Sequence, residues 1–332
     1  MLTRENQRTG RLASGAGACG LLGLLIAMLL PAVAQEAGEK TFAAPEEASK
    51  ALYDNAKASD KSALLTVLGQ SATNVISSGD EVQDKNARDT FLERYVQMHR
   101  WAKQTDGSMT LFIGAENWPF PIPLKKNTSG QWYFDTKAGE QEILLRRIGK
   151  NEIAAIRVLG ALVDGQDEYY NATHDGDSTK QYAPKIISDP GKQNGLYWKV
   201  AEGQPESPIG PLVAFATGEG YGGEHEKAQP FHGYFYHSLT GQGANVKGGA
   251  KSYIVNGKMT NGFAFVGYPA EYRVSGVMTF LVDQAGVIYE KDLGPQTADL
   301  AKAMTAYDPD KTWVVSQVPD VETATDSGDD QQ

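Results

Sequence analysis

Three histidines lie close together and form the first group whose chemistry suggests a metal site. His225, His232 and His237 occur beside Glu224 and Glu226, and imidazole and carboxylate groups are zinc ligands. Zinc ligands usually come as short spaced pairs on one element, whereas His232 and His237 are five residues apart and would point to opposite faces of a strand. The spacing therefore favours independent polar roles, with His225 in a solvated loop and His232 near the start of a strand.

A second group, the stretch THDGD at residues 173–177, resembles the start of a calcium-binding loop. Such loops alternate oxygen ligands that converge on the cation. The pattern is incomplete, because Thr173 stands at the first ligand position, Ser178 replaces the turn glycine and no glutamate closes the loop. Asp175 and Asp177 are therefore the candidate calcium ligands, and a polar turn that ends a helix is the competing interpretation. The sequence indicates no other cofactor.

Patterns typical of enzymes are sparse in this chain. It has no Gly-x-Ser-x-Gly elbow and no Ser-x-x-Lys set with supporting motifs. Acidic pairs such as Glu219 with Glu224, or Glu271 with Asp283, could flank a glycosidic bond, but that chemistry depends on the separation of the two carboxyls. The sequence favours a protein without catalytic activity and leaves a carboxylate-dependent hydrolase as the alternative.

Aromatic and polar side chains of strands and loops form the candidate binding surface. The candidates are Trp118, Tyr197, Trp198, Tyr221, His232 and Tyr234. Such rings can stack on sugars or pack against a partner, although rings on strand faces more often belong to a core. Tyr221 lies between glycines in GEGYGG, a flexible loop in which its ring could cover a ligand as a mobile lid. Acidic residues follow this stretch, so it does not fit a phosphate cradle.

The beginning of the chain has the three-part layout of a secretory signal peptide. Three arginines precede the apolar run Leu21–Leu30, and the small-residue site Ala-Val-Ala ends at Ala34. The apolar run is shorter than the roughly 20 residues of a spanning helix, so we predict cleavage after Ala34 over an uncleaved anchor. Cleavage leaves 298 residues without cysteine and with a net charge of −12. This acidic balance argues against binding to nucleic acid or to an anionic membrane.

Helical patterns followed by strand patterns predict a small α+β domain at residues 40–139. Pro45 suits a first helical position and Asp60 can cap a second helix that Gly69 ends. A longer amphipathic helix is predicted from Asp84 to Lys103. The predicted strands are Met109–Ile113, Trp118–Leu124, whose three prolines suit an edge strand, and Gln131–Asp135.

A long helix and an antiparallel sheet are predicted for residues 140–315. The helix runs from about Glu140, breaks at Gly149 and resumes at Asn151 as its cap. The predicted strands lie near residues 233–239, 250–255 and 262–268, and end in a hairpin that turns at residues 283–286. Phe280, Val282, Val287 or Tyr289 should pack onto the helix around Ile156 and Leu159. The acidic tail at residues 316–332 is expected to be disordered.

The first domain resembles the cone-shaped α+β domains of the nuclear-transport-factor-2-like superfamily. The resemblance rests on FAAPEEASKALYDNAKASDKSALLTVLG and GQWYFDTKAG. It implies a fold that often encloses a ligand pocket, and no catalytic pattern matches well enough to be carried over.

The second domain resembles the headgroups of type IV pilin-like and type II secretion pseudopilin proteins. The residues that carry this resemblance are NEIAAIRVLGALVDGQDEYYNA, GYFYHSL, GFAFVGYPAEY and SGVMTFLVDQAGVIYEKDLG. It implies a helix packed against an antiparallel sheet. The chain departs from pilins because a polar first domain stands where their processing site and apolar stem would lead into the helix, which puts pilus assembly in doubt.

The chain from Lys40 to Val314 closely resembles the bacterial domain-of-unknown-function family 2950. The shared phrases include SSGDEVQD, WPFPIPL, RRIGKNEIAAI, GPLVAFATGEGYGG and YIVNGKMTNGFAFVGYPAEY. The resemblance implies an exported bacterial protein and no particular activity. We therefore expect a periplasmic or secreted protein without a stable membrane anchor after cleavage, acting as a non-catalytic binding or assembly module on an envelope protein or cell-wall component. A hydrolase of cell-wall or glycan material is the alternative.

Overall fold

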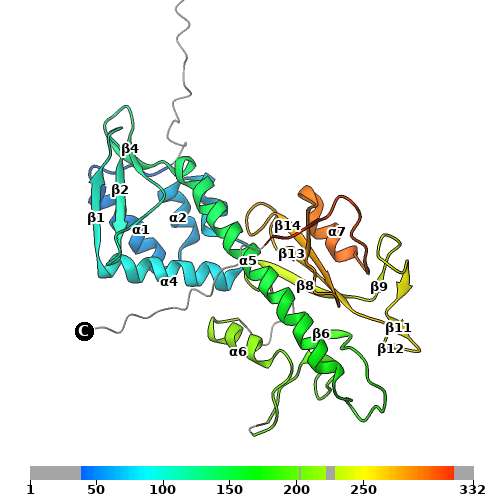
Figure 1. Ribbon diagram of the computed structural model, residues 1–332. Helices are drawn as coiled ribbons and strands as arrows, with labels where there is room; N and C mark the ends of the chain where they lie inside the picture. Colours follow the sequence, from blue (N-terminus) through cyan, green and yellow to red (C-terminus); the bar gives the residue numbers. More distant parts are fainter. Residues whose placement is uncertain (1–38, 202, 222–228, 318–332) are drawn as a thin grey trace, which may run out of the picture. The chain divides into compact units, whose positions relative to one another are not determined.

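The computed structural model describes residues 39–201, 203–221 and 229–317, and these form an α+β fold (Figure 1). The helices are α1 (Pro45–Lys57), α2 (Lys61–Leu68), η1 (Gln70–Ala72), α3 (Thr73–Ile76), α4 (Glu81–Gln97), α5 (Thr136–Tyr170), α6 (Gly210–Gly218), η2 (Gly294–Gln296) and α7 (Thr297–Ala303). In the first half, the strands are β1 (His99–Lys103), β2 (Met109–Ile113), β3 (Trp118–Pro119), β4 (Leu124–Lys126) and β5 (Trp132–Phe134). The remaining strands are β6 (Lys185–Ile187), β7 (Gly195–Tyr197), β8 (Tyr234–Leu239), β9 (Gly241–Gln242), β10 (Lys251–Ser252), β11 (Ile254–Val255), β12 (Lys258–Met259), β13 (Ala264–Pro269), β14 (Met278–Asp283), β15 (Tyr289–Asp292), β16 (Ala306–Tyr307) and β17 (Val314–Val315).

Helices α1 to α4 and the antiparallel sheet β1-β2-β4-β5, with β3 beside β2, form what we call the first module. Its local signals act as predicted. Pro45 occupies the first turn of α1, and the Asp60 side chain accepts the Ala63 N–H at 2.9 Å at the start of α2. Gly69 follows α2 with φ of +85°, a conformation that favours glycine.

Two predictions for the first module were wrong at their ends. The helix expected over Asp84–Lys103 begins at Glu81 and stops at Gln97, and its last part forms β1 instead. Pairing with β2, which places Trp101 opposite Leu111, overrides the helical pattern there. The strand expected over Trp118–Leu124 is interrupted: only β3 and Leu124, the first residue of β4, are paired, because the prolines between them have no N–H to donate to a ladder.

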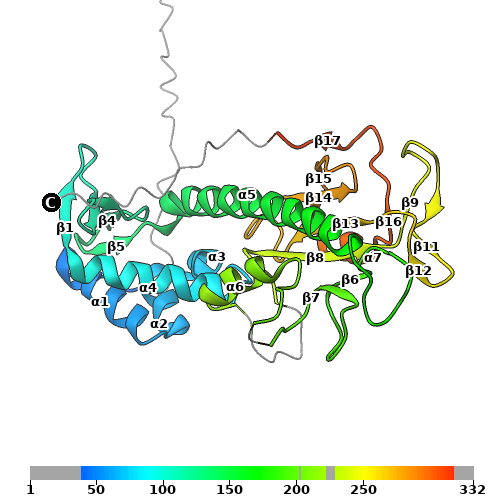
Figure 2. The same cartoon turned by 60° about the horizontal axis from the view of Figure 1, so that its bottom comes forward.

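Helix α5 is continuous over 35 residues and belongs to both halves of the fold (Figure 2). The break predicted at Gly149 does not occur, and Asn151 is a buried interior residue of α5 instead of a cap. The cap is Asp135, whose side chain accepts the Ala138 N–H. The boundary that we predicted between residues 139 and 140 therefore falls inside this helix.

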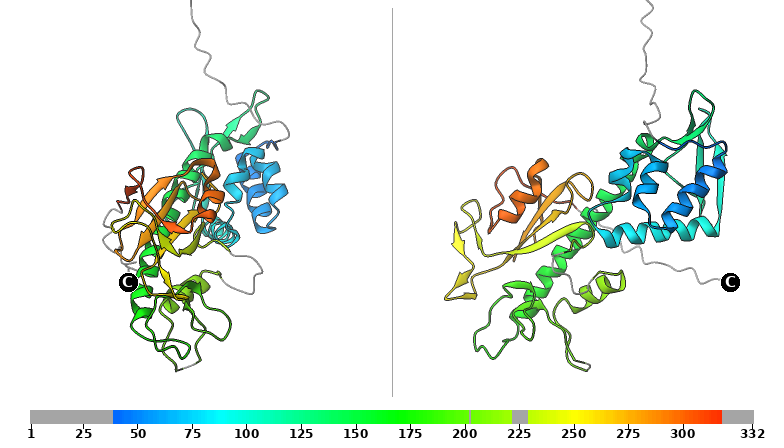
Figure 3. Two further views of the ribbon diagram at one scale, coloured as in Figure 1. Left: turned by 90° about the vertical axis from the view of Figure 1, so that its right-hand side faces the viewer. Right: turned by 180° about the vertical axis from the view of Figure 1, so that it is seen from behind.

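The second half of α5 covers one face of the antiparallel sheet β17-β15-β14-β13-β8, and α7 contacts β13 from the other face (Figure 3). We call residues from the second half of α5 onward the second module. Every residue of β13 is buried, as expected of a strand covered on both faces. The predicted hairpin is present as β14 and β15, with Phe280 only 1% exposed in the same core as Leu159. Val287, at the turn, is 39% exposed and does not contribute.

None of the described helices is both long enough and apolar enough to span a membrane. The predicted signal peptide with Ala34, and all but the first two residues of the predicted tail, lie outside the described residues.

Candidate functional site

A small apolar pocket lies within the first module between its helices. Its volume is about 160 Å³. The apolar side chains that line it are Leu52 and Ala56 of α1, Leu64 and Leu68 of α2, Val75 and Ile76 of α3, Ala87 and Phe91 of α4, and Phe120 after β3. Because four helices and a sheet connection each contribute, the pocket exists only in the assembled module.

The polar part of this pocket is mostly cationic. Lys61, Arg88 and Arg147 line it together with a single carboxylate, Asp84. Both oxygens of Asp84 accept the Ser78 N–H, at 3.0 and 3.1 Å, so this carboxylate already binds the loop before α4. Arg88 has no hydrogen bond or ion pair with any described residue, although its side chain is half-buried. Its guanidinium can therefore receive a ligand's anionic group.

Arg147 fixes the wall of the pocket. Its guanidinium donates to the carbonyls of Asn74 and Val75, each at 2.6 Å, and so ties α5 to α3. Burial lowers the pKa of Arg147, and the nearby charge of Asp84 opposes this shift. Arginine is protonated throughout the physiological pH range, so the pocket keeps this positive charge.

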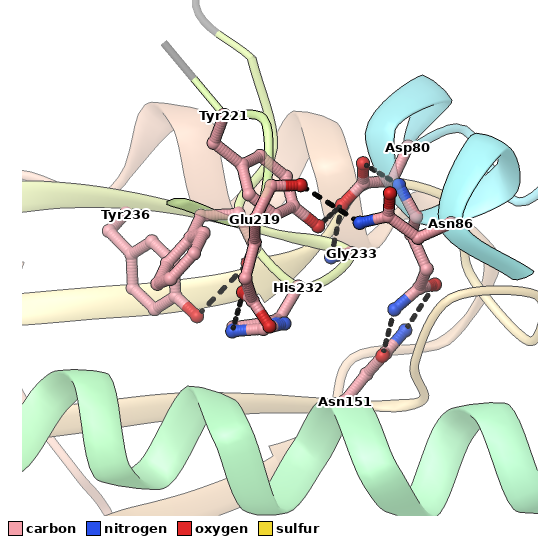
Figure 4. Close-up of polar contacts among 10 residues, drawn as sticks. Asp80, Asn86, Asn151, Glu219, Tyr221, His232, Gly233 and Tyr236 are labelled. Carbon is pink, nitrogen blue, oxygen red and sulfur yellow. Dashed lines mark hydrogen bonds and ion pairs between the residues drawn. The ribbon is translucent and has the colours of Figure 1, made fainter. Parts of the chain in front are cut away.

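A second polar cluster joins the first module to the second, and we call it the junction (Figure 4). At its centre is Asp80, which caps α4 and is 1% exposed. One carboxylate oxygen accepts the Gln83 N–H at 3.0 Å, and the other accepts the Tyr221 hydroxyl at 2.8 Å and the Gly233 N–H at 2.9 Å. One buried carboxylate thus satisfies donors from both modules, as a buried charge requires.

Tyr221 is a fixed part of the junction. It is 7% exposed, and its ring packs edge-on against Phe231 at 4.9 Å. Burial, followed by the charge of Asp80, raises the pKa of Tyr221 well above its ordinary value. The mobile-lid prediction for Tyr221 does not agree with the structure, in which the side chain is buried and its hydroxyl donates to Asp80.

His232 and Glu219 form the side of the junction nearer to α6. His232 Nε2 lies 3.3 Å from Glu219 Oε2, and the Asn86 amide donates to the Glu219 carbonyl at 2.9 Å. Burial lowers the pKa of His232 and exceeds the opposing effect of Glu219. The neutral form of the imidazole is consequently favoured near pH 7.

Asn151 connects the junction to α5. The Gln83 amide donates to Asn151 at 2.6 Å, and Asn151 donates to the Ser275 carbonyl at 2.8 Å. Gly233 packs against it so closely that an added Cβ would lie 2.4 Å from the Asn151 nitrogen, and its φ is +73°. No side chain can replace glycine here without displacing Asn151.

Of the predicted binding residues, the structure brings only Tyr221 and His232 together, with their rings 5.8 Å apart. Tyr234 is fully buried, and its hydroxyl donates to the Met278 carbonyl. The prediction that Tyr234 belongs to a binding surface was therefore wrong. Trp118 packs against Arg94 and Phe120, and Tyr197 and Trp198 pack on the core of the second module. All three are half-buried, and their role in binding stays a prediction.

The candidate calcium ligands have separate protein partners. Asp175 accepts the Gln193 N–H with both oxygens, and Asp177 pairs with Lys258 at 2.7 Å. In the described part of the chain, no three metal-ligating side chains converge. The calcium site at Asp175 and Asp177 stays a prediction.

Two of the remaining candidate residues, His237 and Asp283, are described by the structure, and three are not. His237 Nε2 donates to the Met304 carbonyl at 3.1 Å, away from the His232 contacts. Asp283 accepts the Ala285 N–H within its own turn, and burial raises its pKa. Glu224, His225 and Glu226 lie outside the described residues.

Sequence reasoning missed Asp80, Arg88 and Arg147. For Asp80 a signal was present, since Asp80 followed by Gln83 has the spacing of a helix-capping pair. For the two arginines none was available, because their neighbours in the pocket come from distant parts of the chain.

Comparison with known proteins gives one match, to a protein family. A family model described as "Protein of unknown function (DUF2950)" matches residues 39–316. No curated protein and no solved structure matches. The resemblances to nuclear-transport-factor-2-like cones and to pilin headgroups therefore stay predictions.

Proposed function

Because the chain belongs to the DUF2950 family, whose description names no activity, we propose its function from the sequence and the geometry together. The protein is an exported, non-catalytic module that binds a small ligand in the first module. The observation that carries this proposal is the apolar pocket of about 160 Å³ among α1 to α5. Apolar cavities of about 150 Å³ accept a benzene-sized molecule. The pocket is thus large enough for one small apolar group.

The pocket has the composition of a binding site as well as the size. Ligand sites are lined mainly by apolar side chains with a few placed polar groups, and here nine apolar residues are joined by Arg88 and Arg147. Leu52 and Leu68 are 4% and 3% exposed and belong to the core of the first module, so the pocket rests on packed apolar side chains. Burial of a ligand's apolar surface there is favourable by about 25 cal/mol per Å².

Export to the periplasm or outside the cell is part of the same proposal. It is supported by the basic, apolar and small-residue succession that ends at Ala34. A partner surface on the second module, for an envelope protein or a cell-wall component, stays a prediction. The hydrolase alternative requires two converging carboxyls, and no observation on the described acidic side chains favours it.

A blocking variant tests the pocket. Ala87 lies at an exposed position of α4 and lines the pocket, so Ala87→Trp should fill its mouth without disturbing the core. The matched control is Glu93→Trp, which adds the same ring at an exposed position of the same helix that does not line the pocket.

Binding of the neutral probe phenylacetamide can be followed by saturation-transfer NMR and calorimetry. We expect binding to the wild-type protein and to the Glu93 variant, and at least tenfold weaker binding to the Ala87 variant. Absence of binding to the wild-type protein, or equal binding to all three, would contradict the proposed function.

A further inference from the structure

The charge of the pocket differs from that of the chain. The full chain has a net charge of −10, yet Lys61, Arg88 and Arg147 outnumber the one carboxylate, Asp84, around the apolar floor. Clusters of one sign over a low-dielectric wall concentrate ligands of the opposite sign. An anionic headgroup attached to the apolar group would be attracted to this rim.

The hydrogen-bond partners of the charged residues that line the pocket indicate where that headgroup would bind. Asp84 already accepts the Ser78 N–H with both oxygens, and Arg147 already donates to Asn74 and Val75. Lys61 is exposed, whereas Arg88 is half-buried and makes no polar contact with any described residue. Arg88 is therefore the group whose hydrogen-bonding capacity is available at the mouth of the pocket.

We propose that the pocket binds a small organic carboxylate, with a benzene-sized apolar group on the floor and its carboxylate paired with Arg88. This inference rests on the proposed function. The planar guanidinium presents two parallel N–H groups that match a carboxylate.

The size of the pocket indicates the size of the ligand's apolar group. A pocket of about 160 Å³ accommodates one benzene-sized group, so a long acyl chain or a second ring would have to extend into solvent. The predicted class is consequently aryl-substituted or short branched carboxylic acids.

Two isosteric probes test the charge preference separately from the pocket. Phenylacetate and phenylacetamide have nearly the same shape and differ by one negative charge. Hydrogen bonds to charged groups contribute enough for roughly a tenfold or greater preference, so we expect the purified wild-type protein to bind phenylacetate at least tenfold more tightly.

Arg88 variants assign that preference to one side chain. Arg88→Gln should lower the affinity for phenylacetate to that for phenylacetamide while leaving the affinity for phenylacetamide unchanged, and Arg88→Lys should recover part of the loss. The matched control is Arg157→Gln, a cationic position of α5 that does not line the pocket.

The outcomes are distinguishable. Equal affinity of the wild-type protein for the two probes would overturn the carboxylate inference and leave the binding function intact. Preference for phenylacetate that persists in Arg88→Gln would overturn the role of Arg88. Failure of both probes to bind would overturn the proposed function itself.

Discussion

Replacing Tyr221 by Phe should weaken the junction, because it removes one hydrogen bond from a buried carboxylate. The Tyr221 hydroxyl donates to Asp80 over 2.8 Å, and both residues are buried. The phenylalanine ring can keep the edge-on contact with Phe231, so the hydrogen bond is the main loss. A hydrogen bond to a charged group contributes about 1.5–3 kcal/mol. We expect Tyr221→Phe to lower the free energy of unfolding by about 2 kcal/mol.

A second tyrosine supplies the control for this prediction. The Tyr272 hydroxyl donates to Asp292 over 3.1 Å, the same pair of groups at an exposed position. Exposed contacts to charges contribute little, so Tyr272→Phe should change the free energy of unfolding by less than about 0.5 kcal/mol. Urea unfolding followed by tryptophan fluorescence measures both. Equal effects of the two variants, or an unchanged Tyr221→Phe protein, would refute the argument that burial strengthens the Asp80 contact.

Two further outcomes follow from the second module. Phe280→Asp should lower the free energy of unfolding by more than about 3 kcal/mol, since Phe280 is 1% exposed. The control, Val287→Asp in the same hairpin, should have little effect because Val287 is 39% exposed. An unchanged melting temperature of the Phe280 variant in circular dichroism would contradict the packing of Phe280 in the core. His232 has a folded-state pKa lowered from 6.5 by burial, so the unfolded chain binds its proton more readily and stability should fall as the pH drops below about 6.5. His232→Asn, which tolerates the positive φ there, should flatten the decline between pH 7 and 5.5 in chemical unfolding curves, and parallel curves for the two proteins would exclude this role.

Local signals in the sequence were sufficient for the short-range parts of the fold. Pro45 and Asp60 place α1 and α2 through the dihedral of proline and a capping side chain, both of which act within one turn. The hairpin of β14 and β15 follows from alternation around a turn. The position of Phe280 in the core follows in the same way, because alternation along β14 decides which face it occupies.

Features that depend on distant contacts were missed. Gly149 does not interrupt α5, because a helical glycine costs only about 1 kcal/mol and the helix is held on both sides of it by Arg147 and Asn151. The role of Asn151 depends on Gln83, 68 residues away. The pocket is likewise assembled from five helices, so the sequence suggested a pocket only through a resemblance and could not name Arg88.

The continuity of α5 makes its length a constraint on how this protein can change. Each helical residue advances the chain by about 1.5 Å and rotates it by about 100°. Adding or removing one residue between Arg147 and Asn151 would therefore turn Asn151 away from Gln83 while Arg147 kept its place on α3. Insertions and deletions can be accommodated in surface loops, whereas the segment between these two anchors can vary only by substitution.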